Sequence, residues 1–187
     1  WAEQSRRPFF LALASMHAIA DHLRVGALDA AEAALADLPS GAQASPNFSA
    51  GFAAQLFLLR RSQGRVHEFL PLLDMLVGDQ RAPATWHAGR VLALAETEDP
   101  SAREALRVAV AGLPEVPEDW LWLPTVALLA DACVQLGERH VAQEIARHLA
   151  PHRAEHVVVA HGVAWLGPIG PRLRALEQLT TVRTGTL

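Results

Sequence analysis

Lysine and tyrosine are absent from this sequence of 187 residues, and cysteine occurs once. Without lysine there is neither the phosphate-binding lysine of a Walker loop nor a Schiff-base lysine, so two large classes of enzyme are excluded. Without a second cysteine no intrachain disulfide can form. Cys133 lies in an apolar run, so we expect it to pack in a core in a reducing compartment, the cytoplasm.

The sequence also lacks an excess of basic charge and a long apolar run. Its net charge is −4 and its pI about 6.1, so we expect no direct contact of this segment with nucleic acid. No apolar stretch approaches the roughly 20 residues that span a bilayer, so we expect no membrane contact. Arg6 and Arg7 before an apolar stretch imitate a twin-arginine export signal, but the same stretch serves equally well as a first helix.

What is present favours helices. Hydrophobic residues make up 51% of the chain and charged residues 19%, which is the composition of a folded protein rather than a disordered one. Alanine is abundant, and it is the best intrinsic helix former because it loses no side-chain freedom. The length fits one domain better than two.

A glycine follows an apolar helical run at three places, Gly26, Gly64 and Gly137, and a second amphipathic run begins directly after each. Glycine just past a helix end adopts the left-handed conformation at low cost, so each position predicts a hairpin of two helices. Between Gly64 and Gly137 the segment 96–100 takes the equivalent place, which gives four hairpins in all. The four turns recur at intervals of about 38, 34 and 39 residues, close to the tetratricopeptide period of ~34.

The sequence therefore predicts an all-α fold, a right-handed superhelix of antiparallel helical hairpins (a tetratricopeptide-like α-solenoid) that forms a single domain over 1–187. The expected hairpins are 8–38, 47–78, 83–112 and 121–150, followed by an end segment over 156–181. The expected first helices are 8–24, 47–63, 83–96 and 121–136, and the expected second helices are 27–38, 66–78, 100–112 and 138–150.

The end segment departs from the hairpin pattern. Its pattern predicts a short helix, a glycine-proline elbow at Gly167-Pro168 and a final helix over 171–181, while the three valines 157–159 would also allow a short extended stretch. We expect the final helix to cap the array, with arginines on its outer face.

The last third of the chain resembles a known family in the order of its residues, over 119–124, 128–133, 136–137, 150–152, 158–159 and 162–168. It is similar to the helical-repeat region of bacterial MalT-like and LuxR-type transcriptional regulators and of adenylate-cyclase-linked signalling ATPases. The resemblance is strong over 119–177 and only architectural over 1–118. It implies a sensor or partner-docking role in transcription regulation and signal transduction, with the ATPase and DNA-binding or cyclase parts elsewhere. Family members usually continue past the elbow into a tyrosine- and leucine-rich helix, which this chain lacks.

Several side chains are candidates for a groove that binds a protein, a peptide or a small effector. Tryptophans can line the inner surface of a solenoid, although core packing is the common role of a tryptophan. Arginines can anchor a partner's carboxylates, although a solvated helix face explains them equally. The candidates are Trp86, Trp120, Trp122 and Trp165 with Arg60, Arg61 and Arg90.

Nine histidines invite a test for metal binding or catalysis. His148 and His152 are four residues apart, but Pro151 breaks the helix between them, and no cysteine is near, so we expect no metal site and no cofactor. A non-catalytic regulatory or protein-interaction scaffold is the leading hypothesis. The alternatives are a self-association arm that forms a homodimer and, more remotely, a small-molecule-binding or histidine-based enzyme domain.

Overall fold

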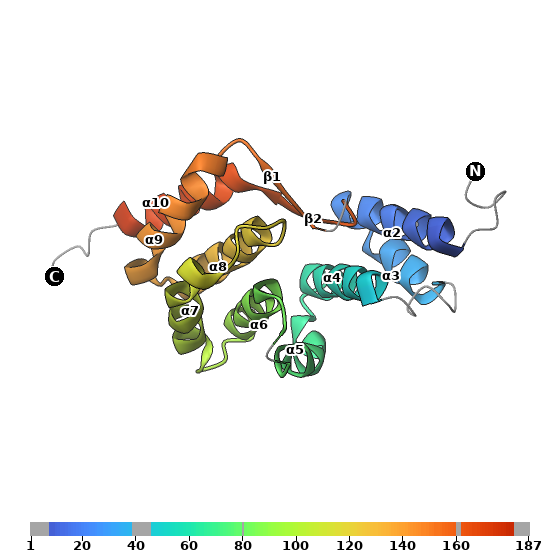
Figure 1. The fold of residues 1–187 in the computed structure, drawn as a ribbon, viewed down its shortest axis with the longest axis horizontal. Helices are drawn as coiled ribbons and strands as arrows, with labels where there is room; N and C mark the ends of the chain where they lie inside the picture. Colours follow the sequence, from blue (N-terminus) through green and yellow to red (C-terminus); the bar gives the residue numbers. More distant parts are fainter. Residues whose placement is uncertain (1–7, 39–45, 80, 160–161, 182–187) are drawn as a thin grey trace. The chain divides into compact units, whose positions relative to one another are not determined.

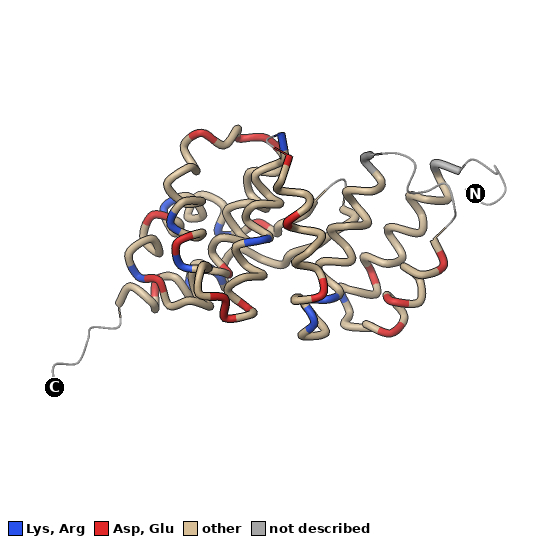
Figure 2. The backbone as a smooth tube through the Cα atoms, turned by 90° about the horizontal axis from the view of Figure 1, so that it is seen from below, with Lys and Arg blue, Asp and Glu red and all other residues tan. Residues whose placement is uncertain are grey.

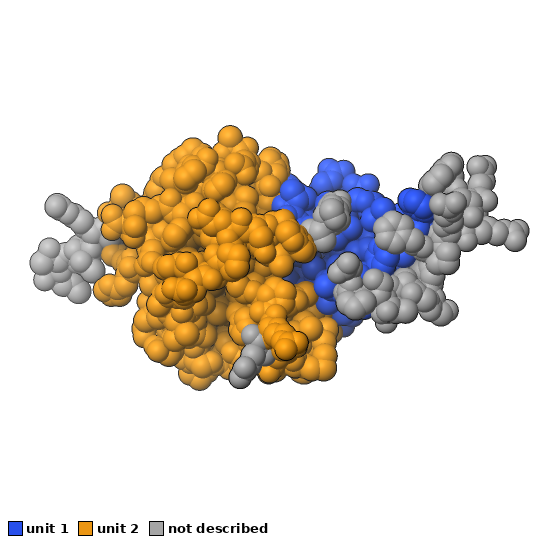
Figure 3. Space-filling model, in the orientation of Figure 1, with its two compact units in different colours: residues 1–66, 158–165 blue, residues 67–157, 166–187 orange. Residues whose placement is uncertain are grey.

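The computed structural model describes residues 8–38, 46–79, 81–159 and 162–181. This part of the chain is helical apart from one two-stranded sheet, which confirms the all-α prediction in its coarse form (Figure 1). The residues group into two compact units (Figure 3). Unit 1 comprises Trp1–Val66 and Val158–Trp165, and unit 2 comprises His67–Val157 and Leu166–Leu187. The number of domains stays a prediction.

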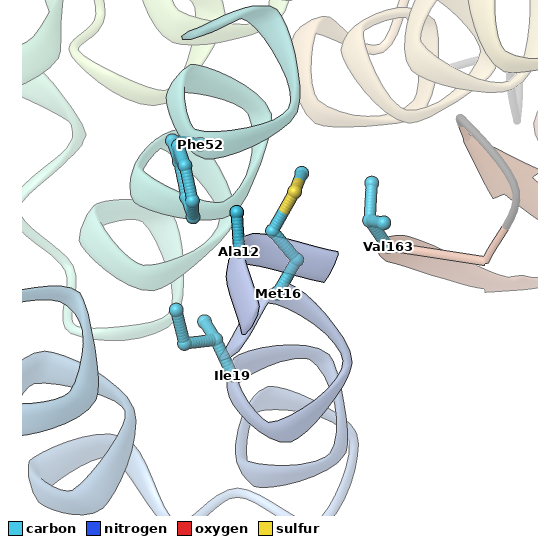
Figure 4. Close-up of a cluster of buried hydrophobic side chains, with 5 residues drawn as sticks. All are labelled: Ala12, Met16, Ile19, Phe52 and Val163. Carbon is cyan, nitrogen blue, oxygen red and sulfur yellow. The ribbon is translucent and has the colours of Figure 1, made fainter. Parts of the chain in front are cut away.

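Unit 1 contains three helices, α2 (Pro8–Arg24), α3 (Leu28–Ala36) and α4 (Pro46–Ser62). Helix α2 packs against both α3 and α4. Its buried residues Ala12, Met16 and Ile19 recur at intervals of four and three, so they lie on one face of the helix. Together with Phe52 of α4 and the distant Val163 they form the apolar cluster drawn in Figure 4.

Unit 2 contains η2 (Val66–Phe69, whose first residue belongs to unit 1), α5 (Leu70–Val77), α6 (Ala84–Glu96), α7 (Ala102–Ala111), η3 (Leu113–Glu115), α8 (Trp122–Leu136), α9 (Arg139–Leu149), η4 (Ala150–His152) and α10 (Ile169–Thr181). Helix α6 packs against α5, α7 and α8, and α8 packs in turn against α9 and α10. Small residues such as Gly89, Ala93 and Ala130 are fully buried on these helices. Their short side chains let neighbouring helices approach closely.

The eight predicted hairpin helices all form, and their ends agree with the prediction to within two residues. In the second hairpin the predicted helix 66–78 is divided into a 3-10 turn and α5, with Pro71 in the first turn of α5. Proline suits that position because its missing N–H has no partner in a first turn.

The four hairpin turns share one backbone motif. Gly26, Gly64 and Gly137 have φ of 75°, 70° and 67°, and Glu98, at 56°, takes the same place in the third hairpin. In each turn the following residue donates to the carbonyl five positions back, as in a Schellman cap. These bonds are Ala27 N to His22 O (2.9 Å), Arg65 N to Arg60 O (2.7 Å), Asp99 N to Leu94 O (2.9 Å) and Glu138 N to Cys133 O (3.1 Å).

The end segment is where the prediction was wrong. Instead of a short helix it forms two paired strands, β1 (His156–Val159) and β2 (Ala164–Pro168), and the predicted elbow Gly167-Pro168 is the end of β2. The extended alternative for the valines is confirmed, because Val157 and Val159 are buried and Val158 is exposed, the alternation of a strand. Gly162 and Gly167 have φ of 86° and 97°, which no right-handed helix accommodates.

The final helix begins at Ile169, two residues earlier than predicted. Its arginines do not all face outward. The Arg172 side chain is 11% exposed and forms an ion pair with Asp131 of α8, which is 16% exposed. The prediction of an outer arginine face was therefore wrong at Arg172, because the half-buried Asp131 attracts it inward. Arg174 is exposed, as predicted.

Charges of both signs are interspersed along the helices of unit 2 (Figure 2), and no helix there is purely basic. Among the residues that the structure describes, no helix has both the length and the apolar character needed to cross a membrane.

Candidate functional site

Arg60 lies in the last turn of α4 and is already paired within unit 1. Its Nη1 donates to Glu32 Oε1 of α3 at 2.6 Å and to Gln63 Oε1 at 2.8 Å, and Gln63 Nε2 donates to the other oxygen of Glu32 at 2.7 Å. The hydrogen bonds from Arg60 and Gln63 lower the pKa of Glu32 below its ordinary value. A partner's carboxylate at Arg60 would have to compete with Glu32.

Arg61 is half-buried beside Arg60, and Arg90 lies on α6 in unit 2. Arg90 Nε donates to Asp74 Oδ1 of α5 at 2.6 Å, so this arginine also has an internal carboxylate. Internal pairing is the role that the structure gives Arg60 and Arg90. Anchoring of a partner by Arg60, Arg61 and Arg90 stays a prediction.

Trp120 and Trp122 stand at the start of α8. Asp119 accepts from Leu121 N at 2.8 Å through its side chain and from Trp122 N at 3.1 Å through its carbonyl, a turn that begins the helix. Trp120 is 63% exposed. Trp122 is half-buried and faces the second helix of its own hairpin.

Two imidazoles contact the indole of Trp122. The ring of His148 lies edge-on at 5.9 Å between centroids, and that of His152 is tilted at 5.7 Å. His152 Nδ1 lies 3.0 Å from Glu155 Oε1, which fixes the orientation of that ring. The arrangement is a packed aromatic contact on the surface of unit 2, of the edge-to-face kind that aromatic rings favour.

Trp86 and Trp165 are both half-buried, but they belong to different units. Trp86 lies in the first turn of α6, next to Thr85, whose hydroxyl lies 2.9 Å from that of Thr125 of α8. Trp165 belongs to the segment of unit 1 that contains Val163. A single groove lined by Trp86, Trp120, Trp122 and Trp165 stays a prediction.

The most specific polar contact in unit 1 was missed by the sequence analysis. Gln55 of α4 is completely buried, and its Nε2 donates to two backbone carbonyls, Met16 O of α2 and Val163 O, each at 2.6 Å. Its Oε1 is also buried and has no hydrogen-bond partner among the described residues. One side-chain amide thus joins two helices to the turn that precedes β2.

Gly51 and Met16 shape the space beside Gln55. A Cβ at position 51 would lie 2.1 Å from Met16 Cε and 3.5 Å from Val163 Cγ2. Glycine therefore leaves room for the methionine and valine side chains to meet over α4. We call the surface formed by Ala12, Met16, Gly51, Phe52 and Gln55 the α2–α4 face. It holds Val163 by apolar contact and by the hydrogen bond from Gln55 Nε2 to the Val163 carbonyl.

A signal for this face exists in the sequence. Gln55 is a polar residue within the largely apolar helix Pro46–Ser62, and Gly51 lies inside that helix, where glycine costs about 1 kcal/mol relative to alanine. A buried amide and a costly glycine one turn apart indicate a backbone that approaches closely. The identity of that backbone, Val163, lies 108 residues away.

In the described part of the chain, no group of three or more His, Cys, Asp and Glu side chains is placed to hold a metal ion. Burial, and secondarily the charge of Glu138, raises the pKa of the Cys133 thiol to about 12. Since the thiolate is the nucleophilic form, this cysteine is inert at neutral pH.

No protein-family model, no curated protein and no solved structure matches this chain. Its function therefore has to be argued from its own residues.

Proposed function

We propose that this protein is a non-catalytic helical-repeat scaffold, the sensor or partner-docking region of a larger bacterial transcriptional regulator or signalling ATPase. The observation that carries the proposal is the recurrence of one Schellman-capped turn in all four hairpins. A repeated hairpin cannot bury its apolar face alone, so repeats of this kind stack, and stacked repeats present extended binding surfaces.

The tetratricopeptide-like right-handed superhelix is part of this proposal. It is supported by the packing of α6 against both its hairpin partner α7 and the first helix of the next hairpin, α8. The same relation holds in unit 1, where α2 contacts α3 and α4. Helices α2 and α6 thus each contact their own hairpin partner and the next first helix, which is the neighbour pattern of a helix-pair solenoid.

Binding is favoured over catalysis by the chemistry of the described side chains. Ion pairs with carboxylates of the same chain occupy the guanidinium groups of Arg60, Arg90 and Arg172, so these charges hold the fold together. The α2–α4 face holds the main chain at Val163 by a side-chain amide and the Val163 side chain by apolar contact, as a site that recognises a peptide would. We propose a peptide or protein segment as the partner class.

The proposal is tested by selecting peptides from a random display library against the purified chain. We expect selected peptides to bind one per chain by calorimetry, and light scattering to show a monomer at all concentrations. A folded monomer that enriches no peptide above an unrelated helical control contradicts partner docking. A mass that doubles with concentration favours the self-association arm instead.

The regulatory part has a separate test in the coding sequence that flanks this segment. A Walker loop encoded upstream, or a helix-turn-helix or cyclase downstream, is the expected result. A short, complete reading frame would contradict the regulator and leave only the scaffold.

A further inference from the structure

We propose that the α2–α4 face is a binding site for an aliphatic peptide, and that residues 162–165 of the same chain, a turn that leads into β2, occupy it as an internal ligand. This inference rests on the proposed function, since it names the site and the chemistry by which a repeat scaffold would take a peptide. A competing peptide would bind by displacing the internal segment.

A hydrogen bond to the main chain holds the segment. Gln55 Nε2 donates to the main-chain carbonyl of Val163 and not to a side chain. A carbonyl is present at every residue of any peptide, so this bond recognises main chain irrespective of sequence. The same Nε2 is oriented by Met16 O of α2, so the donor is held ready for a carbonyl at this place.

The Val163 side chain makes the apolar contact with the α2–α4 face. Val163 is 2% exposed and belongs to the same buried cluster as Met16 and Phe52, and Figure 4 shows it reaching the cluster from a separate segment, beside Met16. Its Cγ2 comes within 3.5 Å of the place where a Cβ on Gly51 would lie. A branched aliphatic side chain of about this size fits the face, and a charged one does not.

The side-chain oxygen of Gln55, Oε1, is buried without a hydrogen-bond partner among the described residues. The two described bonds of this amide both use Nε2, which leaves the buried Oε1 without a donor. A peptide that presents an N–H to Oε1 as well as a carbonyl to Nε2 would satisfy both ends of the amide. An unmet buried acceptor weakens a complex by roughly tenfold or more, so the internal ligand is a replaceable one.

The segment is a separate stretch of unit 1 in the sequence. Residues 158–165 belong to unit 1, while the residues on both sides of them in the sequence belong to unit 2. Gly162 and Gly167, both at positive φ, flank Val163, and backbone rotation at such positions is cheap. The segment is thus a short excursion of the chain that can leave the face while its ends stay covalently attached.

The experiment uses the full chain and a fluorescein-labelled synthetic peptide of residues 162–166, Gly-Val-Ala-Trp-Leu. In the unaltered chain the internal segment competes at an effective concentration in the millimolar range, so the peptide should bind weakly. In Val163→Asp the internal segment is expelled, and we expect the peptide to bind about tenfold more tightly or better. Val158→Asp is the matched control, because Val158 is 47% exposed on β1, the strand that pairs with β2. It should leave binding unchanged.

Two further variants make the result specific. Adding Gln55→Met to Val163→Asp removes the amide at similar size, and we expect peptide binding to fall about tenfold. A peptide that itself carries Val163→Asp should not bind any of the chains.

Hydrogen exchange on the unaltered chain and on Val163→Ala keeps the inference falsifiable if Val163→Asp does not fold. We expect the amides of residues 162–165 to exchange faster than those of α2 and α4, and Val163→Ala to accelerate exchange in the segment alone. If α2 and α4 lose protection together with the segment in either of these two chains, the segment is part of the core and the inference is wrong.

Two other results overturn the inference and separate it from the proposed function. A folded Val163→Asp chain that fails to bind the 162–166 peptide overturns the internal ligand. A library-selected peptide that binds the chain but is not displaced by the 162–166 peptide upholds the scaffold and contradicts this site.

Discussion

Arg172 of α10 holds the carboxylate of Asp131 of α8 with two hydrogen bonds, from Nε to Oδ1 at 2.8 Å and from Nη2 to Oδ2 at 2.9 Å. The same guanidinium donates to the carbonyls of Pro168 at 3.1 Å and Leu166 at 2.7 Å. One side chain therefore ties two helices to the end of β2. The planar fork of arginine permits this, and a lysine ammonium would not reproduce it.

Arg172→Lys should destabilise unit 2. Because both side chains are largely buried, loss of the fork leaves Asp131 poorly compensated, and we expect the free energy of unfolding to fall by about 2–4 kcal/mol. Guanidinium denaturation followed by circular dichroism measures this. Arg174→Lys, on the exposed side of the same helix, should change stability by less than about 0.5 kcal/mol. Equal effects of the two substitutions would show that the ion pair with Asp131 does not contribute to the free energy of unfolding.

Glu98→Gly should stabilise the protein. Glu98 is the one described non-glycine residue with positive φ, and it takes the turn position that glycine fills in the other three hairpins. A left-handed conformation costs an L-residue with a side chain about 1 kcal/mol, which glycine avoids, so we expect a gain of about that size and a higher Tm.

The matched control is Glu104→Gly. Glu104 is exposed within α7, where glycine is a poor helix former, and we expect a loss of about 1 kcal/mol from the same chemical change. Opposite signs at positions 98 and 104 are the expected result in thermal melts. A loss at position 98 would contradict a conformational cost there.

Cys133 should resist thiol reagents in the folded protein. Its Sγ donates to Glu138 O at 3.1 Å, the residue is fully buried, and its pKa is raised to about 12, so almost no thiolate exists at pH 8. We expect labelling by a disulfide reagent to be slow in buffer and to reach one equivalent in guanidinium. Cys133→Ala combined with Ser62→Cys, which places the thiol at an exposed position, should react at once. Fast labelling of the unaltered chain would disprove the burial.

Glu32→Gln should reduce stability in a pH-dependent way. Hydrogen bonds from Arg60 and Gln63 lower the pKa of Glu32 below its ordinary value of 4.5, so the folded state favours the carboxylate. Its contribution is therefore complete well above pH 4.5 and is lost as the pH falls through the lowered pKa. Urea midpoints of both chains from pH 7 to pH 3 should converge at the acid end.

The exposed Glu118 provides the control for this series. Glu118→Gln should give a small difference from the unaltered chain that changes little between pH 7 and pH 3. The Glu32 effect should also shrink in high salt, because the side chain is accessible to screening ions. A Glu32 difference that persists unchanged at pH 3 would refute the pairing with Arg60.

The helices were predictable because their signals are local. Gly26, Gly64 and Gly137 mark helix ends by a backbone preference that depends on one residue, and the apolar periodicity on either side fixes the helix type. Even the third turn, which has no glycine, was located by its equivalent place in the repeat. Periodic signals of this kind survive without tertiary information.

The remaining features depend on residues far apart in the sequence. Arg172 was expected to face outward because nothing near it in sequence is its partner, whereas Asp131 is 41 residues away. Gln55 was overlooked because its acceptors lie 39 and 108 residues away. Strand β1 was ambiguous because a run of valines is compatible with a buried helix until its pairing with β2 is known.

The discontinuity of unit 1 affects the order in which its parts are made. The ribosome delivers α2 and α4 first, and about 100 residues must follow before Val163 emerges. At translation rates of ~5–20 residues per second, Met16 and Phe52 spend about 5–20 s without that partner. During this interval a nascent chain exposes an apolar surface that chaperones, or another polypeptide with a suitable aliphatic segment, can reach before its own segment does.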